Sequence, residues 1–193
     1  MKNWQKIGLG LLIIATLAGI KIAYFPNADL IPSNQEEAQV EKQEEPTAKA
    51  VRKVYVNIFF IGHNENKEEV YRAVKREYNE EKDGSKLRFA IENLLTGPTA
   101  KESAKGVYTE IPQGTRLISL EETPEKASIN LSGDFENGGG TDGLYKRLYQ
   151  LIKTSNKNAN TSVYLYINGK QAEVVGGEGI MINQPLNERS LDE

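Results

Sequence analysis

The residues of this chain that could do chemistry form short, separate groups. Three consecutive glycines, 138–140, precede a helix-like segment, where free N–H groups and the helix dipole could hold an anion. The Lys-Ser/Thr pair of a phosphate-binding loop does not follow them, because Leu144-Tyr145 occupies that region. A flexible turn into a helix explains the same glycines without any ligand.

A second glycine group, Gly176-Gly-Glu-Gly179, permits close backbone approach, and Glu178 could ligate a metal there. Such a site would need Asp134 or Asp142 to fold close to it; otherwise this segment is a loop that crosses a sheet edge. We therefore predict no catalytic, cofactor-binding or metal-binding residue and no cofactor. The alternative that we keep is a cell-wall-acting enzyme or small-ligand receptor that uses the loop at 176–179.

The remaining reactive residue types are few. Cysteine is absent and His63 is the single histidine, which excludes disulfides, thiolate metal sites and cysteine nucleophiles and leaves little for a histidine-based triad. Glu80-Glu81 and Glu121-Glu122 are adjacent pairs, so in strands their side chains point apart and do not converge as in a glycosidase. Tyr145 and Tyr149, four residues apart, predict an aromatic pair on a helix surface or an interface.

The N-terminal 50 residues differ from the rest of the chain. The segment from Ile7 to Phe25 has 19 residues with one charge, Lys21, which is near the ~20 residues that span a membrane. Lysines before it and acidic residues after it predict a cytoplasmic N-terminus. We expect residues 1–25 to be a retained signal-anchor or transmembrane segment, with a cleaved signal peptide as the alternative.

Residues 26–50 contain six acidic residues, two lysines and three prolines, a composition typical of a disordered acidic linker. Residues 51–193 are then enough for one extracytoplasmic domain of ordinary size. The formal net charge of −3 gives no electrostatic basis for binding nucleic acid.

Hydrophobic periodicity predicts the elements of this domain. Residues 52–62 are apolar on both faces, as in a central strand, whereas residues 68–78 fit either a helix or a strand. Residues 85–96 predict a helix capped by Ser85 and ended by Gly97 in a left-handed conformation, and residues 99–102 have the spacing of a capping box. The apolar residues at helical spacing within the predicted helix 85–96 are Leu87, Ala90, Ile91, Leu94 and Leu95.

The second half of the domain predicts two hairpins around a helix. Residues 117–121 and 127–131 flank a turn with Pro124, and a helix capped by Thr141 or Asp142 follows and ends within 156–160. Residues 163–167 and 171–175 flank Asn168-Gly169, a strong hairpin signal. We expect this last hairpin to lie at a sheet edge, where unpaired backbone groups can pair with another chain.

The sequence between Leu94 and Leu120, with LLTGP followed by IPQGTRLISL, resembles the core of the GerMN domain, the module of GerM-type sporulation and germination proteins. Further landmarks match in the same order over roughly residues 54–186: residues 129–135, 138–140, 166–170 and 176–179. The resemblance implies that residues 68–78 form a strand paired back on the first one. The expected fold is then α+β in the order β-β-α-β-β-α-β-β, a mostly antiparallel sheet with two helices on one face, similar to ring-building motifs.

The same resemblance implies a non-catalytic, membrane-anchored, extracytoplasmic protein-interaction domain of the cell envelope, GerM-like, with a role in assembling a sporulation or germination complex. The expected partners are other envelope or membrane proteins, with membrane attachment through the N-terminal helix and self-association left open. Compared with the type protein, we expect one GerMN domain instead of two, and a plain anchor in place of a lipidation site.

Overall fold

The computed structural model describes residues 53–177 and 179–191. The predicted anchor at 1–25 and the predicted linker at 26–50 lie outside these residues. None of the helices within the described ranges has the length and apolarity that crossing a membrane requires.

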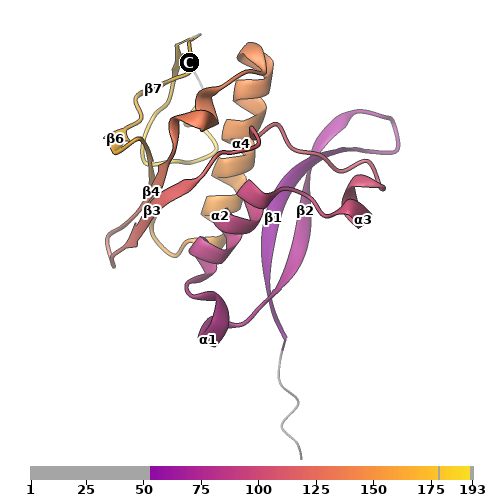
Figure 1. Cartoon of the computed structure of the whole chain (residues 1–193), viewed down its shortest axis with the longest axis horizontal. Coiled ribbons are helices and arrows are strands. Elements are labelled where there is room, and N and C mark those ends of the chain that lie inside the picture. Colours follow the sequence, from indigo (N-terminus) through magenta and orange to yellow (C-terminus); the bar gives the residue numbers. More distant parts are fainter. Residues whose placement is uncertain (1–52, 178, 192–193) are drawn as a thin grey trace, which may run out of the picture. The chain divides into compact units, whose positions relative to one another are not determined.

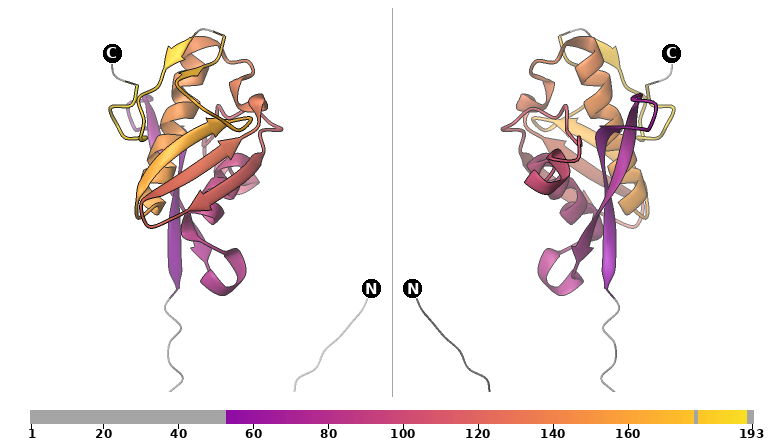
Figure 2. Two further views of the ribbon diagram at one scale, coloured as in Figure 1. Left: turned by 90° about the vertical axis from the view of Figure 1, so that its left-hand side faces the viewer. Right: turned by 90° about the vertical axis from the view of Figure 1, so that its right-hand side faces the viewer.

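The described residues fold into three layers, with two helices between a strand ribbon and a four-stranded sheet (Figure 1 and Figure 2). The ribbon consists of β1 (Val54–His63) and β2 (Glu69–Tyr78), and the helices are α2 (Lys86–Thr96) and α4 (Gly140–Asn158). The sheet contains β3 (Leu117–Glu122), β4 (Lys126–Leu131), β5 (Ser162–Ile167) and β6 (Lys170–Gln171). Both helices pack on the inner face of this sheet, where the side chains of Ile129 and Leu165 are fully buried.

The predicted single sheet is wrong, because the strands form three separate sheets. The third is a short pair, β7 (Val174–Val175) with β8 (Ile180–Met181). Pairing is antiparallel except between β4 and β5, which run parallel because α4 provides the crossover between them. The ribbon stays apart from the four-stranded sheet because side chains of α4, and not another strand, bind the outer edge of β1.

The predicted order of the longer elements is confirmed, with short additions between them: α1 (Glu80–Asp83), α3 (Ala100–Ser103) and the 3-10 helix η1 (Gly133–Glu136). Residues 69–78 form a strand, so the helical alternative is wrong there. Its register is continuous, from Val54 opposite Tyr78 to His63 opposite Glu69. Val74, half-buried against the core, lies opposite the fully buried Ile58, which gives the strand its apolar face.

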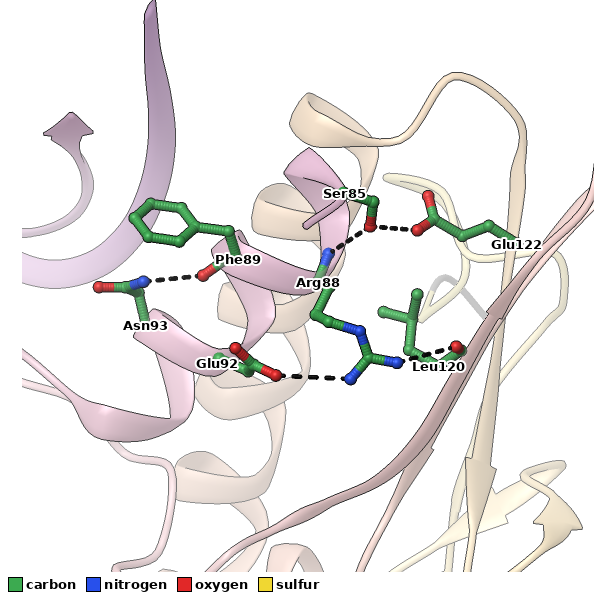
Figure 3. Close-up of polar contacts among 7 residues, drawn as sticks. All are labelled: Ser85, Arg88, Phe89, Glu92, Asn93, Leu120 and Glu122. Atoms are coloured by element: carbon green, nitrogen blue, oxygen red, sulfur yellow. Dashed lines mark hydrogen bonds and ion pairs between the residues drawn. The ribbon is translucent and has the colours of Figure 1, made fainter. Parts of the chain in front are cut away.

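The capping signals of α2 are confirmed. The Ser85 hydroxyl accepts a hydrogen bond from the Arg88 N–H at 3.2 Å, and Gly97 has a φ of 86° at the other end. The same hydroxyl donates to the carboxylate of Glu122 on β3 (Figure 3). Arg88 also donates to the Leu120 carbonyl oxygen at 3.1 Å, so the first turn of α2 is fixed to β3 by two side chains.

Helix α4 begins at Gly140 with Gly139 as its cap residue, so the predicted cap at Thr141 or Asp142 is wrong. A side chain from within the helix organises this start instead. The buried Arg147 guanidinium donates hydrogen bonds of 2.7–2.9 Å to the carbonyl oxygens of Phe135, Asn137 and Gly138.

The Asn168-Gly169 turn is confirmed, with φ values of 49° and 80°. The predicted single strand at 171–175 is interrupted: β6 ends at Gln171, and residues 174–175 form β7 of another sheet. The side-chain amide of Gln184 takes the place of the strand, because it pairs with the N–H and C=O of Leu165 at 2.7 and 3.0 Å. Residues 174–175 are thereby free to pair with β8.

Candidate interaction surface along β2

The glycine run at 138–140 surrounds an arginine of the chain itself. All three glycines have positive φ, and a Cβ built on Gly139 would lie 2.4 Å from Nη2 of Arg147. Close approach to the buried guanidinium therefore requires glycine at Gly139, whereas positive φ favours it at Gly138 and Gly140.

The loop at 176–179 forms the turn between β7 and β8, in which Gly176 and Gly179 both have φ of 74° and Glu178 lies outside the described residues. The Gly176 N–H donates to the Glu136 carboxylate at 2.8 Å. A nearby hollow of about 450 Å³ is lined by Glu136 and residues from 167–174, not by residues 176–179.

The acidic residues considered for a metal site are not brought together. Asp134 lies 3.5 Å from Arg116, whereas Asp142 pairs with Lys146 at 2.7 Å in the first turns of α4. Within residues 53–177 and 179–191, three or more His, Asp or Glu side chains never converge as a metal site would require. His63 is exposed, with its ring 6.2 Å from that of Tyr108.

The predicted aromatic pair lies beside a charged cluster between β2 and α4. Tyr145, Tyr149 and Tyr71 line a hollow of about 270 Å³, with the Tyr71 and Tyr149 rings 5.9 Å apart. Lys146 contacts carboxylate oxygens of Asp142 and Glu69, each at 2.7 Å.

These contacts move the pKa values of the cluster away from neutrality. Hydrogen bonds to Asp142 and Glu69 raise the pKa of Lys146, and the bond from Lys146 lowers that of Glu69. Burial, followed by the neighbouring Tyr149, raises the pKa of Tyr71 to about 12. A general acid or base works best with a pKa near the operating pH, so this cluster has the character of a structural network.

The outer edge of β1 is covered by hydrogen-bonding side chains of α4. Asn158 donates to the Asn57 carbonyl oxygen at 2.7 Å, the Phe59 N–H donates to the Thr154 hydroxyl at 2.9 Å, and Gln150 donates to the Phe59 carbonyl oxygen at 3.2 Å. Farther along, Ile61 exchanges two backbone hydrogen bonds of 2.9 Å with Tyr108. In Figure 1, β1 accordingly lies between α4 and β2.

The edges of the four-stranded sheet are covered in part. On β3, Arg88 binds the Leu120 carbonyl oxygen, and the register shifts between Leu117 and Ser119. On the other side, the Gln184 amide and the Leu186 N–H extend the edge along β5. The prediction that the last hairpin lies at a sheet edge is correct for β6, but β6 is only two residues long.

The outer edge of β2 is open. The backbone N–H and C=O of Ile61 point away from β2, since they bind Tyr108. In an antiparallel pair, the opposite residue, Tyr71, must then point its own N–H and C=O away from β1. Backbone direction alternates along a strand, so Ala73 and Lys75 also point their N–H and C=O groups outward. These outward N–H and C=O groups have no hydrogen-bond partner among the described residues. Ala73 and Lys75 are exposed, so solvent reaches the backbone here. An open edge of this kind can accept another strand.

The charges on β2 are paired unequally. Arg76 makes two hydrogen bonds, of 2.5 and 2.7 Å, to Glu102 of α3, and these bonds lower the pKa of Glu102 to about 2. Glu77 pairs with Lys53 at 2.9 Å. Arg72 and Lys75 are exposed and have no ion pair with any described residue.

Comparison with known proteins supports the fold described above. The family model described as "Germane: Sporulation and spore germination" matches residues 57–173. The first GerMN domain of the sporulation protein GerM from Bacillus subtilis is similar in structure, with a TM-score of 0.56 and 21% identity, covering 70% of this chain and 98% of that one. At this identity, the likeness shows a shared fold.

Two further structures are more distant. The tandem GerMN domains of the same Bacillus subtilis protein give a TM-score of 0.48 and 20% identity over 70% of this chain, which spans 46% of that structure. A putative lipoprotein from Clostridium perfringens gives a TM-score of 0.42 and 17% identity, with the match covering 66% of this chain and 83% of that one. Among curated proteins, none matches this sequence.

Proposed function

This chain belongs to the Germane family of sporulation and spore germination proteins, and from that premise we propose that it is a non-catalytic binding domain whose β2 edge pairs with an extended segment of another envelope protein. In this proposal the N-terminal segment anchors the chain in the cell membrane and the domain lies outside. The complex that it helps to assemble serves sporulation or germination.

The observation that carries this proposal is the difference between the sheet edges. Side chains, a loop backbone or the C-terminal segment bind the edges of β1 and β5, and a side chain binds one carbonyl oxygen of β3, whereas β2 offers outward backbone groups along much of its ten-residue length. Main-chain pairing at such an edge supplies affinity, and side chains on the two faces supply specificity. Tethering to a membrane would add a high effective concentration, so that weak pairing is sufficient.

Photo-cross-linking in sporulating cells tests the proposal. A photoreactive residue at Lys75 on the open edge should capture an envelope protein, whereas the same residue at the exposed Lys126 on β4 should not. Ala73→Pro should abolish the adduct, because it removes one outward N–H of β2. Equal capture at the two positions, or none at Lys75, would count against the edge as the binding site.

The alternative, a cell-wall-acting enzyme or small-ligand receptor that uses the loop at 176–179, predicts a different result. Glu178→Gln preserves the side-chain shape and removes the charge, and we expect it to leave sporulation unchanged. If this variant folds normally but abolishes function, a catalytic or metal-binding role replaces the binding-domain proposal.

A further inference from the structure

We infer that the segment paired with β2 is acidic: an extended strand with two carboxylates three residues apart, one facing Arg72 and the other facing Lys75. This inference rests on the proposed function, since it specifies the partner of the same edge. Two observations carry it: the domain already neutralises some of the charges on β2, and the remaining charges lie at fixed positions along the strand.

Of the five charged side chains of β2, three are neutralised within the domain. Glu69 pairs with Lys146, Arg76 with Glu102 and Glu77 with Lys53. Both carboxylates of the strand are therefore already engaged by cations. The two charges left without an ion pair among the described residues, Arg72 and Lys75, are both positive.

The spacing of these two cations sets the spacing of the acids. Side chains alternate between the faces of a strand, so Arg72 and Lys75, three positions apart, lie on opposite faces of the ribbon. A paired strand must then carry its carboxylates at positions i and i+3. Acids at i and i+2 would both lie on one face, and only one of them could meet a cation.

The surroundings of the two cations allow this pairing. The aliphatic part of Arg72 lies over Gly62, where an added Cβ would approach Arg72 Cδ to 2.5 Å, so the glycine leaves room for this side chain on the ribbon. The residue between them on the Lys75 face is Ala73, whose methyl group leaves space for a larger side chain on the partner. Opposite charges on directly paired residues stabilise a sheet, and like charges destabilise it.

Synthetic ten-residue peptides and the purified full-length chain can test this chemistry. The probe peptide carries two glutamates at i and i+3 among threonines and valines; one control has the glutamates at i and i+2, and another has lysines at i and i+3. In fluorescence anisotropy, we expect the probe to bind about threefold more tightly than the i/i+2 control, which loses one charge pair, and about tenfold more tightly than the lysine control.

Charge reversal provides a second measurement that a general loss of folding would not imitate. The double variant Arg72→Glu/Lys75→Glu should no longer bind the acidic probe and should bind the lysine peptide instead. Lys126→Glu, the matched control on β4, should bind the peptides as the unaltered chain does. Circular dichroism verifies that each variant is folded. Equal binding of the two acidic peptides, or no change on charge reversal, overturns the inference.

The failure of this inference can be distinguished from that of the proposed function. If cross-linking at Lys75 captures an envelope protein but neither acidic peptide binds, the edge is the site and the partner chemistry is wrong. If Lys75 captures nothing and no peptide binds, both are wrong.

Discussion

The two strands of the ribbon have ten residues each and share one uninterrupted ladder, yet their outer edges differ. On β1, the Asn57 carbonyl oxygen and both backbone groups of Phe59 and Ile61 bind side chains of α4 or the backbone of Tyr108. On β2, the corresponding groups of Tyr71, Ala73 and Lys75 are free among the described residues. Two paired strands of equal length therefore have one edge that is part of the core and one that faces solvent.

This difference shows how a two-stranded ribbon can be stably packed in the domain and still keep one edge open for binding. An isolated hairpin is marginally stable in water and needs packing on another element. Here α4 supplies most of that packing through β1, with Gln150 and Thr154 fully buried. Its contacts with β2 are side-chain contacts to Glu69 and Tyr71, near the start of that strand. Because one edge holds the ribbon in place, the other can bind a partner without the domain having to open.

The largest difference in stability is expected between proline substitutions at two adjacent residues of β2, Val74 and Ala73. Val74 directs its N–H into the ladder opposite Ile58, so Val74→Pro should cost about 3 kcal/mol or more. The N–H of Ala73 points outward, so Ala73→Pro should cost less than about 1 kcal/mol. Chemical denaturation of the two variants measures the contrast. Equal losses would mean that the edge of β2 is not open.

The next largest loss of stability should follow from removing the Gln150 side chain, which covers the outer edge of β1. Gln150→Leu leaves the Phe59 carbonyl oxygen and the Glu110 N–H without their partner, which should cost about 2–3 kcal/mol. Gln171→Leu, at an exposed glutamine of β6, is the matched control and should stay within about 0.5 kcal/mol. Similar thermal stability for the two variants would contradict the role assigned to α4.

A smaller effect concerns the ion pair that fixes β2 to α3. Glu102 has its pKa lowered from 4.5 to about 2 by Arg76, so its contribution to stability is complete above pH 4.5 and is lost as the pH falls toward 2. Glu102→Gln should cost about 2 kcal/mol at neutral pH. It should also flatten the acid dependence of unfolding between those pH values. An unchanged acid profile would show that the pair does not stabilise the strand.

The smallest effect on stability is expected at the open edge itself. Lys75 has no ion pair among the described residues, so Lys75→Glu should change the free energy of unfolding by no more than about 0.5 kcal/mol. Its binding to an acidic strand should fall all the same. A loss above about 1 kcal/mol in urea denaturation would indicate that Lys75 contributes to the fold.

Features encoded by neighbouring residues could be predicted from the sequence. Ser85 and Gly97 delimit α2, and Asn168-Gly169 forms its turn, because capping groups and left-handed backbone are local requirements. The start of α4 could not be predicted in this way, since Arg147, several residues into the helix, organises the preceding loop.

The division into separate sheets also depends on distant contacts. A usable signal was present: Gln150, Thr154 and Asn158 lie four residues apart on α4, forming an uncharged polar stripe on one helix face. Such a stripe, when buried, must bind backbone groups. The open edge of β2 was missed because residues 68–78 fit both a helix and a strand, and because edge position depends on which strands pair.

The antiparallel register places Val54 opposite Tyr78, so the chain enters the ribbon at the end away from the hairpin turn. Consider a pull on β1 at Val54, directed away from that turn, while a partner holds β2. The two strands would then be forced to slide lengthwise, and the whole ladder would share the load, instead of its hydrogen bonds breaking one after another. Resistance to such a force is governed by an unfolding rate. With a partner bound to β2 as proposed, the ribbon would carry a pulling force in shear between Val54, where the chain enters it, and the bound strand.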